Sequence, residues 1–338
     1  MKALQLTGYG GSGRLRIVDV PQPVAAPGEV LIRVHYAGLN PVDYKTRDGS
    51  LRAIQSYALP VTMGNEVSGD VAAVGAGVTG WAAGDEVLVR LARQRMGGFA
   101  EYVATDALLL ARKPRALPMH VAAGVPLVAL TAWQCLFEYG RIGEGSRVLI
   151  HAGAGAVGRA AIQMAKNAGA VVATTVSPRG RSVAAALGAD VLIDYHQQRF
   201  EDLVSNRDFV LDTVGGGTLM RSFTVLRRGG RLCSIAGMPE RRTAGDLGKP
   251  LPLRIAYGAL FAMMAAPLTL RGLVSGVDYR FVFMRTDGAR LQQIADQIEA
   301  GKLTFEVAKT YDMDDFVAAF DDLEHATTSG KLVMKVRP

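Results

Sequence analysis

The chain has 338 residues, 49% hydrophobic and 20% charged, which excludes an intrinsically disordered protein and favours two domains over a single core. Its two cysteines are too few for a disulfide framework or a four-cysteine zinc lobe. The net charge of +7 comes from basic residues scattered in short clusters, so we expect a solvated basic surface rather than a nucleic-acid-binding patch.

The first part of the chain alternates short apolar runs with turns that are rich in glycine. Strands are predicted over residues 29–36, 67–74 and 86–89, because apolar and β-branched residues cluster there between turn signals. We therefore expect a β-rich domain in this part of the chain.

From residue 122 the pattern changes to longer helical periods between short strands. The predicted strands cover residues 148–151, 171–175, 191–194, 209–212 and 231–235. Their alternation with helices predicts a parallel sheet joined by crossover helices. A further helix is predicted over 287–300, followed by a final strand over 331–336 that returns to the first domain. The β-rich domain would then comprise residues 1–121 and 285–338, and residues 122–284 would form an inserted second domain.

One uncharged apolar run, residues 255–270, is shorter than the roughly 20 residues that a membrane-spanning helix needs. We expect a buried helix, a lid over the active site or a subunit contact there. The wider segment 239–278 is expected to cover the substrate cleft or to lie in a subunit contact. The first residues show no signal-peptide pattern, so we expect a cytoplasmic protein without a membrane span.

Three glycines with the spacing G-x-G-x-x-G, Gly153, Gly155 and Gly158, follow the predicted strand 148–151 and precede a helix-forming run. In this strand–turn–helix context the spacing predicts a dinucleotide-binding turn. Gly153 permits the tight turn, Gly155 lets the backbone approach a pyrophosphate, and Gly158 lets the helix pack on the strand. The free N–H groups and the positive end of the helix dipole would face the phosphates.

The second strand of this domain ends without the acidic residue that would select NAD by binding the ribose 2′-hydroxyl. Ser177, Arg179 and Arg181 stand there instead. Each charge-assisted hydrogen bond to a 2′-phosphate would contribute about 1.5–3 kcal/mol, so two of them would favour NADPH roughly a hundredfold or more. We therefore predict NADPH as the cofactor, against the alternative of two surface arginines on a loop.

Collinear motifs span nearly the whole chain, at residues 39–45, 63–71, 84–87, 97–103, 130–133, 187–190, 212–216 and 330–333. Together they resemble the medium-chain dehydrogenase/reductase superfamily. Within it the chain is similar to the zinc-free quinone oxidoreductases and alkenal/enone reductases. The resemblance implies an α/β protein, with a GroES-like β-rich catalytic domain and a Rossmann domain that has a doubly wound parallel sheet.

The zinc alcohol dehydrogenases of this superfamily have a cysteine in the motif that begins here at Asn40, and a histidine where this chain has Asn65. Asparagine is a poor zinc ligand beside thiolate and imidazole, so we expect no bound metal. Without a Lewis acid, alcohol oxidation is not expected. What is expected is hydride transfer from NADPH to a small electrophilic substrate, a quinone or the C=C bond of an α,β-unsaturated carbonyl.

The same resemblance implies which residues bind the cofactor. They are Asn40, Lys45, Thr131, Gly155, Ala156, Val157, Gly158, Ser177, Arg179, Tyr195, Thr213, Val214, Ala236, Gly237, Phe281, Val282, Phe283 and Lys331. Gly153 joins this set from the turn motif, and Arg181 joins it on charge alone. Tyr44 and Tyr57 are candidates for a phenol hydrogen bond to the substrate oxygen, with Lys45 as an electrostatic helper. A half-buried aromatic side chain and a surface lysine are the alternatives.

Other functions stay open. A non-catalytic NADPH-binding redox sensor or RNA-binding partner would fit the basic charge and the lack of an identified catalytic acid. An enoyl-thioester reductase and a residual alcohol dehydrogenase are further alternatives. An edge strand at residues 279–284 would pair across a two-fold axis, so we expect a homodimer.

Overall fold

The computed structural model describes residues 1–325 and 328–337, which form two compact units. Unit 1 contains Met1–Leu130 and the described residues from Thr286 on, and unit 2 contains Thr131–Arg285. The first boundary lies within helix α3 (Pro126–Trp133). The domain boundaries expected from the sequence, after residues 121 and 284, stay a prediction.

Unit 1 is built mainly on antiparallel strands. One sheet has the order β2-β1-β4, and a second has the order β15-β16-β3-β5-β6-β8 with β7 paired to β3. The strands are β1 (Lys2–Leu6), β2 (Leu15–Asp19), β3 (Glu29–Leu39), β4 (Val61–Thr62), β5 (Glu66–Val74), β6 (Glu86–Arg90), β7 (Tyr102–Asp106), β8 (Leu110–Arg112), β15 (Val307–Asp312) and β16 (Lys331–Lys335). Their inward-facing side chains, among them Leu4, Ile32 and Val67, form one hydrophobic core together with Phe99 from the segment between β6 and β7.

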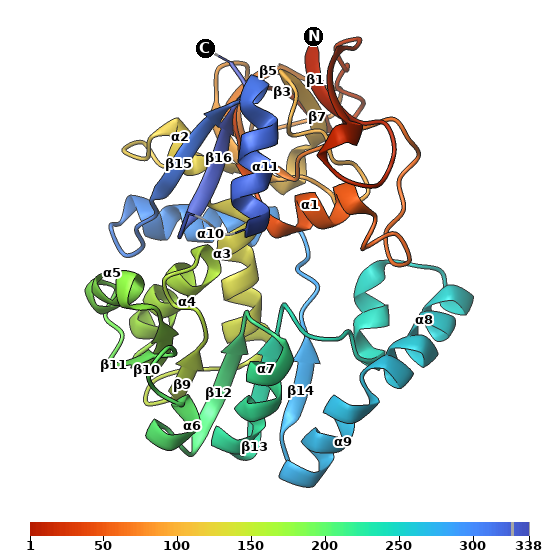
Figure 1. Ribbon diagram of the computed structural model, residues 1–338. Coiled ribbons are helices and arrows are strands. Elements are labelled where there is room, and N and C mark those ends of the chain that lie inside the picture. The colour runs from red at the N-terminus through yellow and green to blue at the C-terminus, as the bar shows by residue number, and fades with distance from the viewer. Residues whose placement is uncertain (326–327, 338) are drawn as a thin grey trace. The chain divides into compact units, whose positions relative to one another are not determined.

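The last strand returns to the β-rich unit, as predicted. β16 pairs antiparallel with β3, so that Leu332 stands opposite Leu39, and Figure 1 shows β15 and β16 together in this unit. The helices of unit 1 are α1 (Pro41–Asp48), α2 (Met119–Ala122), α10 (Gly288–Glu299) and α11 (Phe316–His325), with short 3-10 helices η1 (Ser12–Arg14), η2 (Ala107–Leu109) and η7 (Met313–Asp315). Helix α10 is the helix predicted over 287–300.

Unit 2 is a parallel α/β domain. Its strands are β9 (Arg147–Ile150), β10 (Val171–Val176), β11 (Val191–Asp194), β12 (Arg207–Asp212), β13 (Leu226–Ser234) and β14 (Asp278–Phe281). The strand order is β11-β10-β9-β12-β13-β14, and the paired strands are parallel. This is the 3-2-1-4-5-6 strand order of a Rossmann fold. The order in which successive strands are added to the sheet reverses between β9 and β12. The predicted fold class is confirmed.

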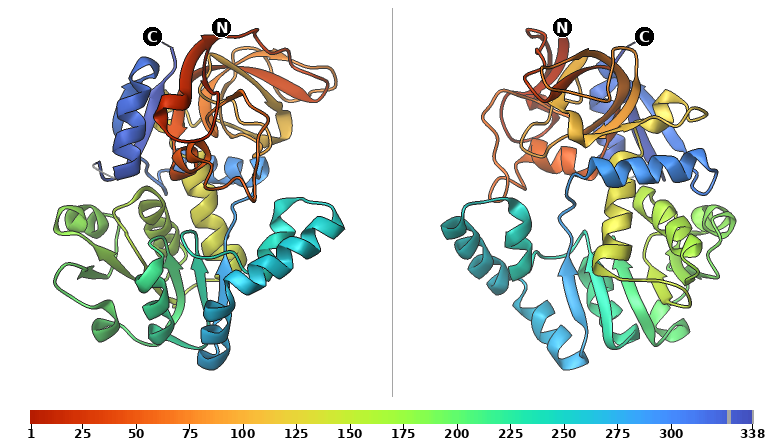
Figure 2. Two further views of the ribbon diagram at one scale, coloured as in Figure 1. Left: turned by 45° about the vertical axis from the view of Figure 1, so that its right-hand side comes forward. Right: turned by 180° about the vertical axis from the view of Figure 1, so that it is seen from behind.

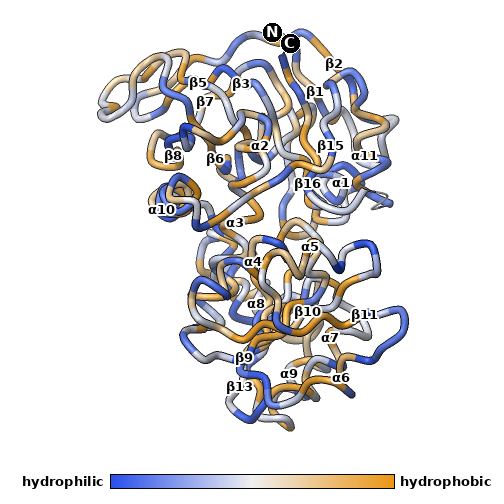
Figure 3. Tube along the Cα trace, turned by 90° about the vertical axis from the view of Figure 1, so that its left-hand side faces the viewer, coloured by the Kyte–Doolittle hydropathy of each residue, from blue (hydrophilic) through white to orange (hydrophobic). Residues whose placement is uncertain are grey.

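Helices join these strands and lie on both faces of the sheet, with α8 and α9 beside its β14 edge (Figure 1, Figure 2). They are the π-helical segment η3 (Gln134–Tyr139), α4 (Ala156–Asn167), α5 (Arg181–Ala186), α6 (Phe200–Leu203), α7 (Gly216–Ser222), α8 (Leu251–Met264) and α9 (Ala266–Ser275), with 3-10 helices η4 (Pro178–Gly180), η5 (Phe223–Val225) and η6 (Arg241–Leu247). The core of the sheet includes Leu149, Val210 and Leu232. Figure 3 shows hydrophobic stretches along β9 and β10.

The apolar run 255–270 does not form a buried helix, so that alternative was wrong. It lies within α8 and α9, whose exposed large apolar side chains are Leu251, Leu253, Ile255, Leu260, Met263, Met264, Leu270, Leu273 and Val274. Within the part of the chain that the structure describes, no single helix has the length and hydrophobicity to cross a membrane. Helices α8 and α9 meet that test only as a pair, which is bent by 69°.

Candidate active site

The predicted cofactor-binding residues of unit 2 follow the carboxyl ends of the parallel strands. Gly153 follows β9, Ser177 follows β10, Tyr195 follows β11, Thr213 and Val214 follow β12, Ala236 and Gly237 follow β13, and Val282 and Phe283 follow β14. Because these ends share one edge of a parallel sheet, the fold brings the residues to one side of unit 2. This edge includes the reversal between β9 and β12, where open α/β sheets bind ligands.

Each glycine of the turn between β9 and α4 has a geometric role. A Cβ atom on Gly153 would lie 2.1 Å from Thr174 Oγ1, and one on Gly158 would lie 2.3 Å from the carbonyl oxygen of Ala152. The fold itself therefore requires these two glycines. A Cβ atom on Gly155 would meet only the Ala152 carbonyl oxygen within 4 Å, at 3.2 Å, so the space in front of Gly155 is open.

Helix α4 begins after this turn with its positive end uncompensated. No side chain caps it at Gly155, and its first turn contains no acidic residue. The first N–H groups of a helix have no intrahelical acceptor, and the helix dipole adds positive potential there. Arg159 holds the preceding turn, since its Nε donates to the carbonyl of Ala154 at 2.8 Å. This arrangement fits an anionic group such as a pyrophosphate.

His151, at the end of β9, is a structural residue. Its Nδ1 lies 3.1 Å from Thr175 Oγ1, its Nε2 lies 3.0 Å from Ser222 Oγ, and its ring packs edge-on against Phe200. Burial lowers the pKa of His151 to about 3, so the imidazole is neutral at pH 7. Its carbonyl accepts a hydrogen bond from Thr213 Oγ1 at 2.9 Å, which ties together the ends of β9 and β12.

The residues predicted to bind a 2′-phosphate lie on the surface after β10. Arg179 is exposed, and its guanidinium makes no hydrogen bond or ion pair with residues 1–325 or 328–337. Arg181 Nη1 reaches the carbonyl of Leu192 at 3.5 Å, a long hydrogen bond. Ser177 is half-buried and Tyr195 is exposed. Of the two arginines, Arg179 therefore has the guanidinium that is freer to bind a phosphate.

A buried carboxylate braces the loops after β12 and β13. Asp212 accepts the N–H of Val214 at 3.2 Å and the hydroxyl of Ser234 at 2.6 Å. Ser234 Oγ accepts the N–H of Ala236 at 3.1 Å, and its carbonyl accepts the N–H of Val282 at 2.9 Å. Val214 and Ala236 are thus held by the side chains of Asp212 and Ser234, which the sequence analysis had not singled out, and Val282 is held by the backbone carbonyl of Ser234.

The remaining predicted residues of unit 2 are Gly237, Phe281, Phe283 and Thr131. A Cβ atom on Gly237 would lie 2.6 Å from Tyr279 Oη. Phe281 packs against the core, and its ring centroid lies 6.0 Å from that of Phe283. Thr131 is buried in α3. Their contact with a cofactor stays a prediction.

In unit 1 the predicted residues Asn40 and Lys331 meet at a buried carboxylate. Lys331 Nζ lies 2.6 Å from Asn40 Oδ1, 2.6 Å from Glu66 Oε1 and 3.0 Å from the carbonyl oxygen of Leu39. Asn40 Nδ2 donates to the same Glu66 oxygen at 2.8 Å. An ammonium group has three donors, so Lys331 has none left. All three residues are at most 5% exposed.

Asp43 and Asn65 extend this buried cluster. Asp43, in the first turn of α1, accepts the backbone N–H of Asn40 at 2.8 Å and the side-chain Nδ2 of Asn65 at 2.6 Å. Arg90 Nη1 donates to the carbonyl of Asn65 at 2.8 Å. Burial raises the pKa of Asp43 to about 6. We call Asn40, Asp43, Asn65, Glu66 and Lys331 the buried polar cluster.

The sequence analysis named Asn40 and Lys331 but missed the cluster around them. A signal was available, because Glu66 begins a strand whose remaining residues, apart from Ser68 and Asp70, are apolar or glycine. A carboxylate in a core requires a cation or several donors, and that requirement points to a distant lysine or arginine. Its identity as Lys331 depends on the pairing of β16 with β3.

Zinc does not fit these residues. The two positions that correspond to zinc ligands carry amides, and Nδ2 of Asn40 and Asn65 already donate to Glu66 and Asp43. The Oδ1 of Asn40 accepts a hydrogen bond from Lys331, whose ammonium would repel a metal cation. Residues 1–325 and 328–337 contain no cluster of three or more His, Cys, Asp or Glu side chains that could hold a metal ion.

The predicted catalytic residues of unit 1 differ in their hydrogen bonding. Tyr44 and Tyr57 both pack, partly buried, against the core. Tyr57 Oη donates to the carbonyl of Arg93 at 2.8 Å, and burial raises the pKa of Tyr57 to about 12. Burial also raises the pKa of Tyr44. Among the described residues, neither the Tyr44 hydroxyl nor the Lys45 ammonium has a hydrogen-bond partner.

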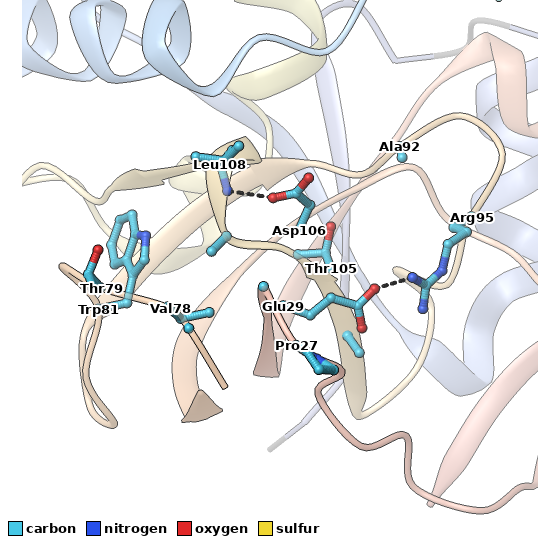
Figure 4. A pocket seen from close by; sticks show the side chains of 14 residues that line it. Pro27, Glu29, Val78, Thr79, Trp81, Ala92, Arg95, Thr105, Asp106 and Leu108 are labelled. Atoms are coloured by element: carbon cyan, nitrogen blue, oxygen red, sulfur yellow. Dashed lines mark hydrogen bonds and ion pairs between the residues drawn. The ribbon is translucent and has the colours of Figure 1, made fainter. Parts of the chain in front are cut away.

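A pocket of about 610 Å³ lies elsewhere in unit 1 and contains none of the predicted site residues (Figure 4). Its two carboxylates are engaged, since Glu29 forms an ion pair with Arg95 and Asp106 accepts the N–H of Leu108 at 2.8 Å. Trp81 and Leu108 supply apolar wall. We assign no role to this pocket.

Two family models match this chain. The alcohol dehydrogenase GroES-like domain matches residues 26–115, and the zinc-binding dehydrogenase family matches residues 187–334. The mitochondrial NAD(P)H oxidoreductase RTN4IP1 of Bos taurus is 32% identical over 99% of this chain and 89% of its own length. The 2-methylene-furan-3-one reductase of Solanum lycopersicum is 32% identical over 100% of this chain and 80% of its own length. The quinone oxidoreductase from Coxiella burnetii superimposes with a TM-score of 0.86 at 31% identity, covering 100% of this chain and 99% of that one.

Proposed function

The chain belongs to the medium-chain dehydrogenase/reductase superfamily, and from this premise we propose that it is an NADPH-dependent reductase of quinones or of the C=C bond of α,β-unsaturated carbonyls. Similar proteins include a quinone oxidoreductase and a 2-methylene-furan-3-one reductase. The observation that carries the proposal is the open glycine turn at Gly155, which precedes an uncapped helix at the reversal of the strand order.

The glycine turn fits the pyrophosphate of a nicotinamide dinucleotide. The proposed contacts are Gly153, Gly155, Ala156, Val157 and Gly158. The N–H groups of Gly153 and Gly155 already donate to the carbonyls of Thr175 and Ala152, so these two glycines are proposed to contribute close approach of the backbone. The first N–H groups of α4 itself have no intrahelical acceptor and are proposed to bind the phosphate oxygens. When bound, the nicotinamide supplies a hydride to an electrophilic acceptor.

NADPH rather than NADH is proposed because of the residues that follow β10. Ser177 offers a hydroxyl and Arg179 offers an exposed guanidinium with no partner among the described residues. Arg181 adds positive charge, although part of its hydrogen-bonding capacity is directed at the Leu192 carbonyl. A guanidinium binds a phosphate bidentately, which a ribose hydroxyl cannot match.

The other proposed cofactor residues are Asn40, Lys45, Thr131, Tyr195, Thr213, Val214, Ala236, Gly237, Phe281, Val282, Phe283 and Lys331. Asn40 and Lys331 are special among them, because all of their side-chain N–H donors are already used within unit 1. We propose that these two residues act mainly by holding the buried polar cluster in one arrangement.

The reductase is proposed to work without zinc. The amides of Asn40 and Asn65 and the ammonium of Lys331 leave no set of thiolate and imidazole ligands at the corresponding positions. Stabilisation of a developing enolate or hydroquinone anion is then the task of hydrogen-bond donors and fixed positive charge.

Tyr44, with Lys45 beside it in sequence, is the better candidate for the hydrogen-bond donor to the substrate oxygen. Its hydroxyl has no acceptor among the described residues, and burial keeps it protonated by raising its pKa. Tyr57 is the weaker candidate, because its proton is already donated to the Arg93 carbonyl.

We also propose a cytoplasmic homodimer. β14 is the last strand of the six-stranded sheet, and an edge strand can pair with a second copy across a two-fold axis. The carbonyls of Tyr279 and Phe281 already accept hydrogen bonds from Arg242 Nη2 at 2.5 Å and Thr243 Oγ1 at 3.4 Å, so this pairing would replace those two bonds. Light scattering at micromolar concentration tests this, and a monomeric mass would remove the proposal.

The test of function is turnover of NADPH and of NADH by the purified chain, with a simple quinone and a short conjugated enone as acceptors. For Arg179→Ala we expect the KM for NADPH to rise about tenfold or more, with NADH turnover unchanged. The control is Arg199→Ala, an exposed arginine of the same unit that forms ion pairs with Glu201 and Asp202 and is not among the proposed cofactor residues.

Absence of turnover with either cofactor would contradict the proposal. Tight NADPH binding without turnover would favour the non-catalytic sensor, and RNA binding that weakens strongly with salt would favour the RNA-binding partner.

A further inference from the structure

The stretch of unit 2 that holds α8 and α9 has basic residues but no acidic ones. From Gly248 to Val277 the chain contains Lys249, Arg254 and Arg271 and neither Asp nor Glu. Arg254 and Arg271 are exposed, and none of the three cations forms an ion pair with residues 1–325 or 328–337. The stretch therefore carries positive charge that its own unit does not neutralise.

Only a narrow stripe of the two helices packs on the rest of unit 2. The buried positions are Gly258 and Phe261 in α8, and Leu268 and Gly272 in α9. Figure 1 shows both helices beside the β14 edge of the parallel sheet. Most of the circumference of each helix therefore remains open.

The open surface is apolar. On α9, Leu270, Leu273 and Val274 are 63%, 74% and 71% exposed, and their spacing of three and four residues places them on one face. On α8, Ile255 and Met263 are 65% and 70% exposed. We call these five residues the α8–α9 face. An exposed apolar face of this kind marks an interaction site.

The occupant of this face must be apolar where it meets the leucines and anionic where it meets the arginines. A second copy of the chain would bring the same acid-free surface, and Arg254 and Arg271 would find no acidic partner there. A bilayer of anionic lipids offers both features, since acyl chains receive the apolar side chains and lipid phosphates pair with the cations.

We propose that the α8–α9 face docks on the surface of an anionic lipid bilayer. This inference goes beyond the reductase activity and does not depend on it.

The helices would lie in the membrane interface rather than cross the bilayer. α8 has 14 residues and α9 has 10. At about 1.5 Å per residue, neither reaches across a hydrocarbon core of roughly 30 Å. The bend of 69° between them also prevents one continuous span. Two helices at this angle can both lie in the plane of the membrane interface.

The test is co-sedimentation of the purified full chain with phosphatidylcholine vesicles, with and without phosphatidylglycerol. We expect the wild type to sediment with the anionic vesicles and to be released by added salt. The variant Leu270→Gln/Leu273→Gln/Val274→Gln should stay in the supernatant. Its matched control is Leu108→Gln in unit 1, where the exposed leucine is 81% accessible, and this control should sediment like the wild type.

A second variant keeps the test decisive if the glutamine variant does not fold. Arg254→Gln/Arg271→Gln retains the apolar face and removes two of the three cations, and it should bind anionic vesicles about tenfold or more weakly. Wild-type protein that sediments with neither vesicle type would overturn the proposal. So would a glutamine variant that sediments like the wild type. If the wild type binds neither kind of vesicle and the glutamine variant has half the wild-type mass in light scattering, the α8–α9 face is the contact with a second copy.

Discussion

Replacing Lys331 by methionine perturbs the centre of the buried polar cluster. Lys331→Met keeps an unbranched side chain but removes the ammonium that donates to Glu66, Asn40 and the Leu39 carbonyl. Glu66 is fully buried and Lys331 is nearly so. The substitution therefore leaves a carboxylate charged in the core without its cation.

The expected cost follows from this burial. Removing one partner of a buried ion pair costs about 3–5 kcal/mol, against about 0–1 kcal/mol for an exposed pair. Glu66 keeps two donors, Asn40 Nδ2 at 2.8 Å and the Leu127 N–H at 2.6 Å, so we expect about 3 kcal/mol, the lower end of that range. The double variant Lys331→Met/Glu66→Gln leaves no charge unpaired and should recover at least about 1 kcal/mol.

The assay is urea unfolding followed by the fluorescence of Trp81. The chain has two tryptophans, Trp81 in unit 1 and Trp133 in unit 2, so a Trp133→Phe background reports on unit 1. Midpoints convert to free energies of unfolding while the slope is unchanged. The control is Lys335→Met on the same strand, which should stay within about 0.5 kcal/mol of its parent. A Lys331→Met protein within about 1 kcal/mol of its parent, or a double variant less stable than the single one, would refute the reasoning.

Three further predictions concern the glycine turn, the buried histidine and the proton donor. Gly153→Ala should lower the free energy of unfolding by roughly 1–3 kcal/mol because its Cβ atom overlaps a side chain, whereas Gly155→Ala should stay near wild-type stability and raise the KM for NADPH. The folded protein keeps His151 neutral with a pKa of about 3, while the unfolded chain protonates it below about 6.5. Stability should therefore fall as pH drops from 7 to 4, by about 3 kcal/mol from this group, and His151→Gln should flatten that part of the dependence in urea titrations. Tyr44→Phe should lower kcat at least about tenfold, with Tyr57→Phe as the comparator that changes it less; equal effects would contradict the assignment.

Local patterns predicted the elements whose burial is regular along the chain. The strand predicted over 191–194 is β11 with the same bounds, and those predicted over 148–151 and 171–175 differ from β9 and β10 by no more than one residue at each end. Strand β15 was not predicted, because most of its residues are exposed and show no apolar alternation. It exists through its pairing with β16, which lies outside any local window.

The run 255–270 is hydrophobic in sequence but largely exposed in the structure. A helix that is apolar on all sides is typical of a core or of contact with lipid, and composition alone does not distinguish these settings. Only the packing of Phe261 and Leu268 against the unit, with Ile255 and Leu270 left exposed, separates the buried stripe from the open face.

The glycine turn was predictable because strand, turn and helix are adjacent in sequence. The buried polar cluster was not, since Lys331 and Asn40 are 291 positions apart. They meet because β16 pairs with the end of β3. A carboxylate at Glu66 implied a partner, but only the sheet register identifies which cation it is.

The two groups of candidate residues differ in whether their hydrogen-bonding capacity is already used. In unit 1, Lys331, Asn40 and Glu66 satisfy one another, so a ligand that bound them would have to replace bonds that exist. In unit 2, the first N–H groups of α4 have no intrahelical acceptor, and the guanidinium of Arg179 has no acceptor among residues 1–325 and 328–337. Cofactor affinity is therefore expected to come mainly from unit 2, while the cluster supplies fixed charge in a rigid setting. The consequence is a crossed pattern: Lys331→Met should change stability more than the KM for NADPH, and Arg179→Ala should do the reverse.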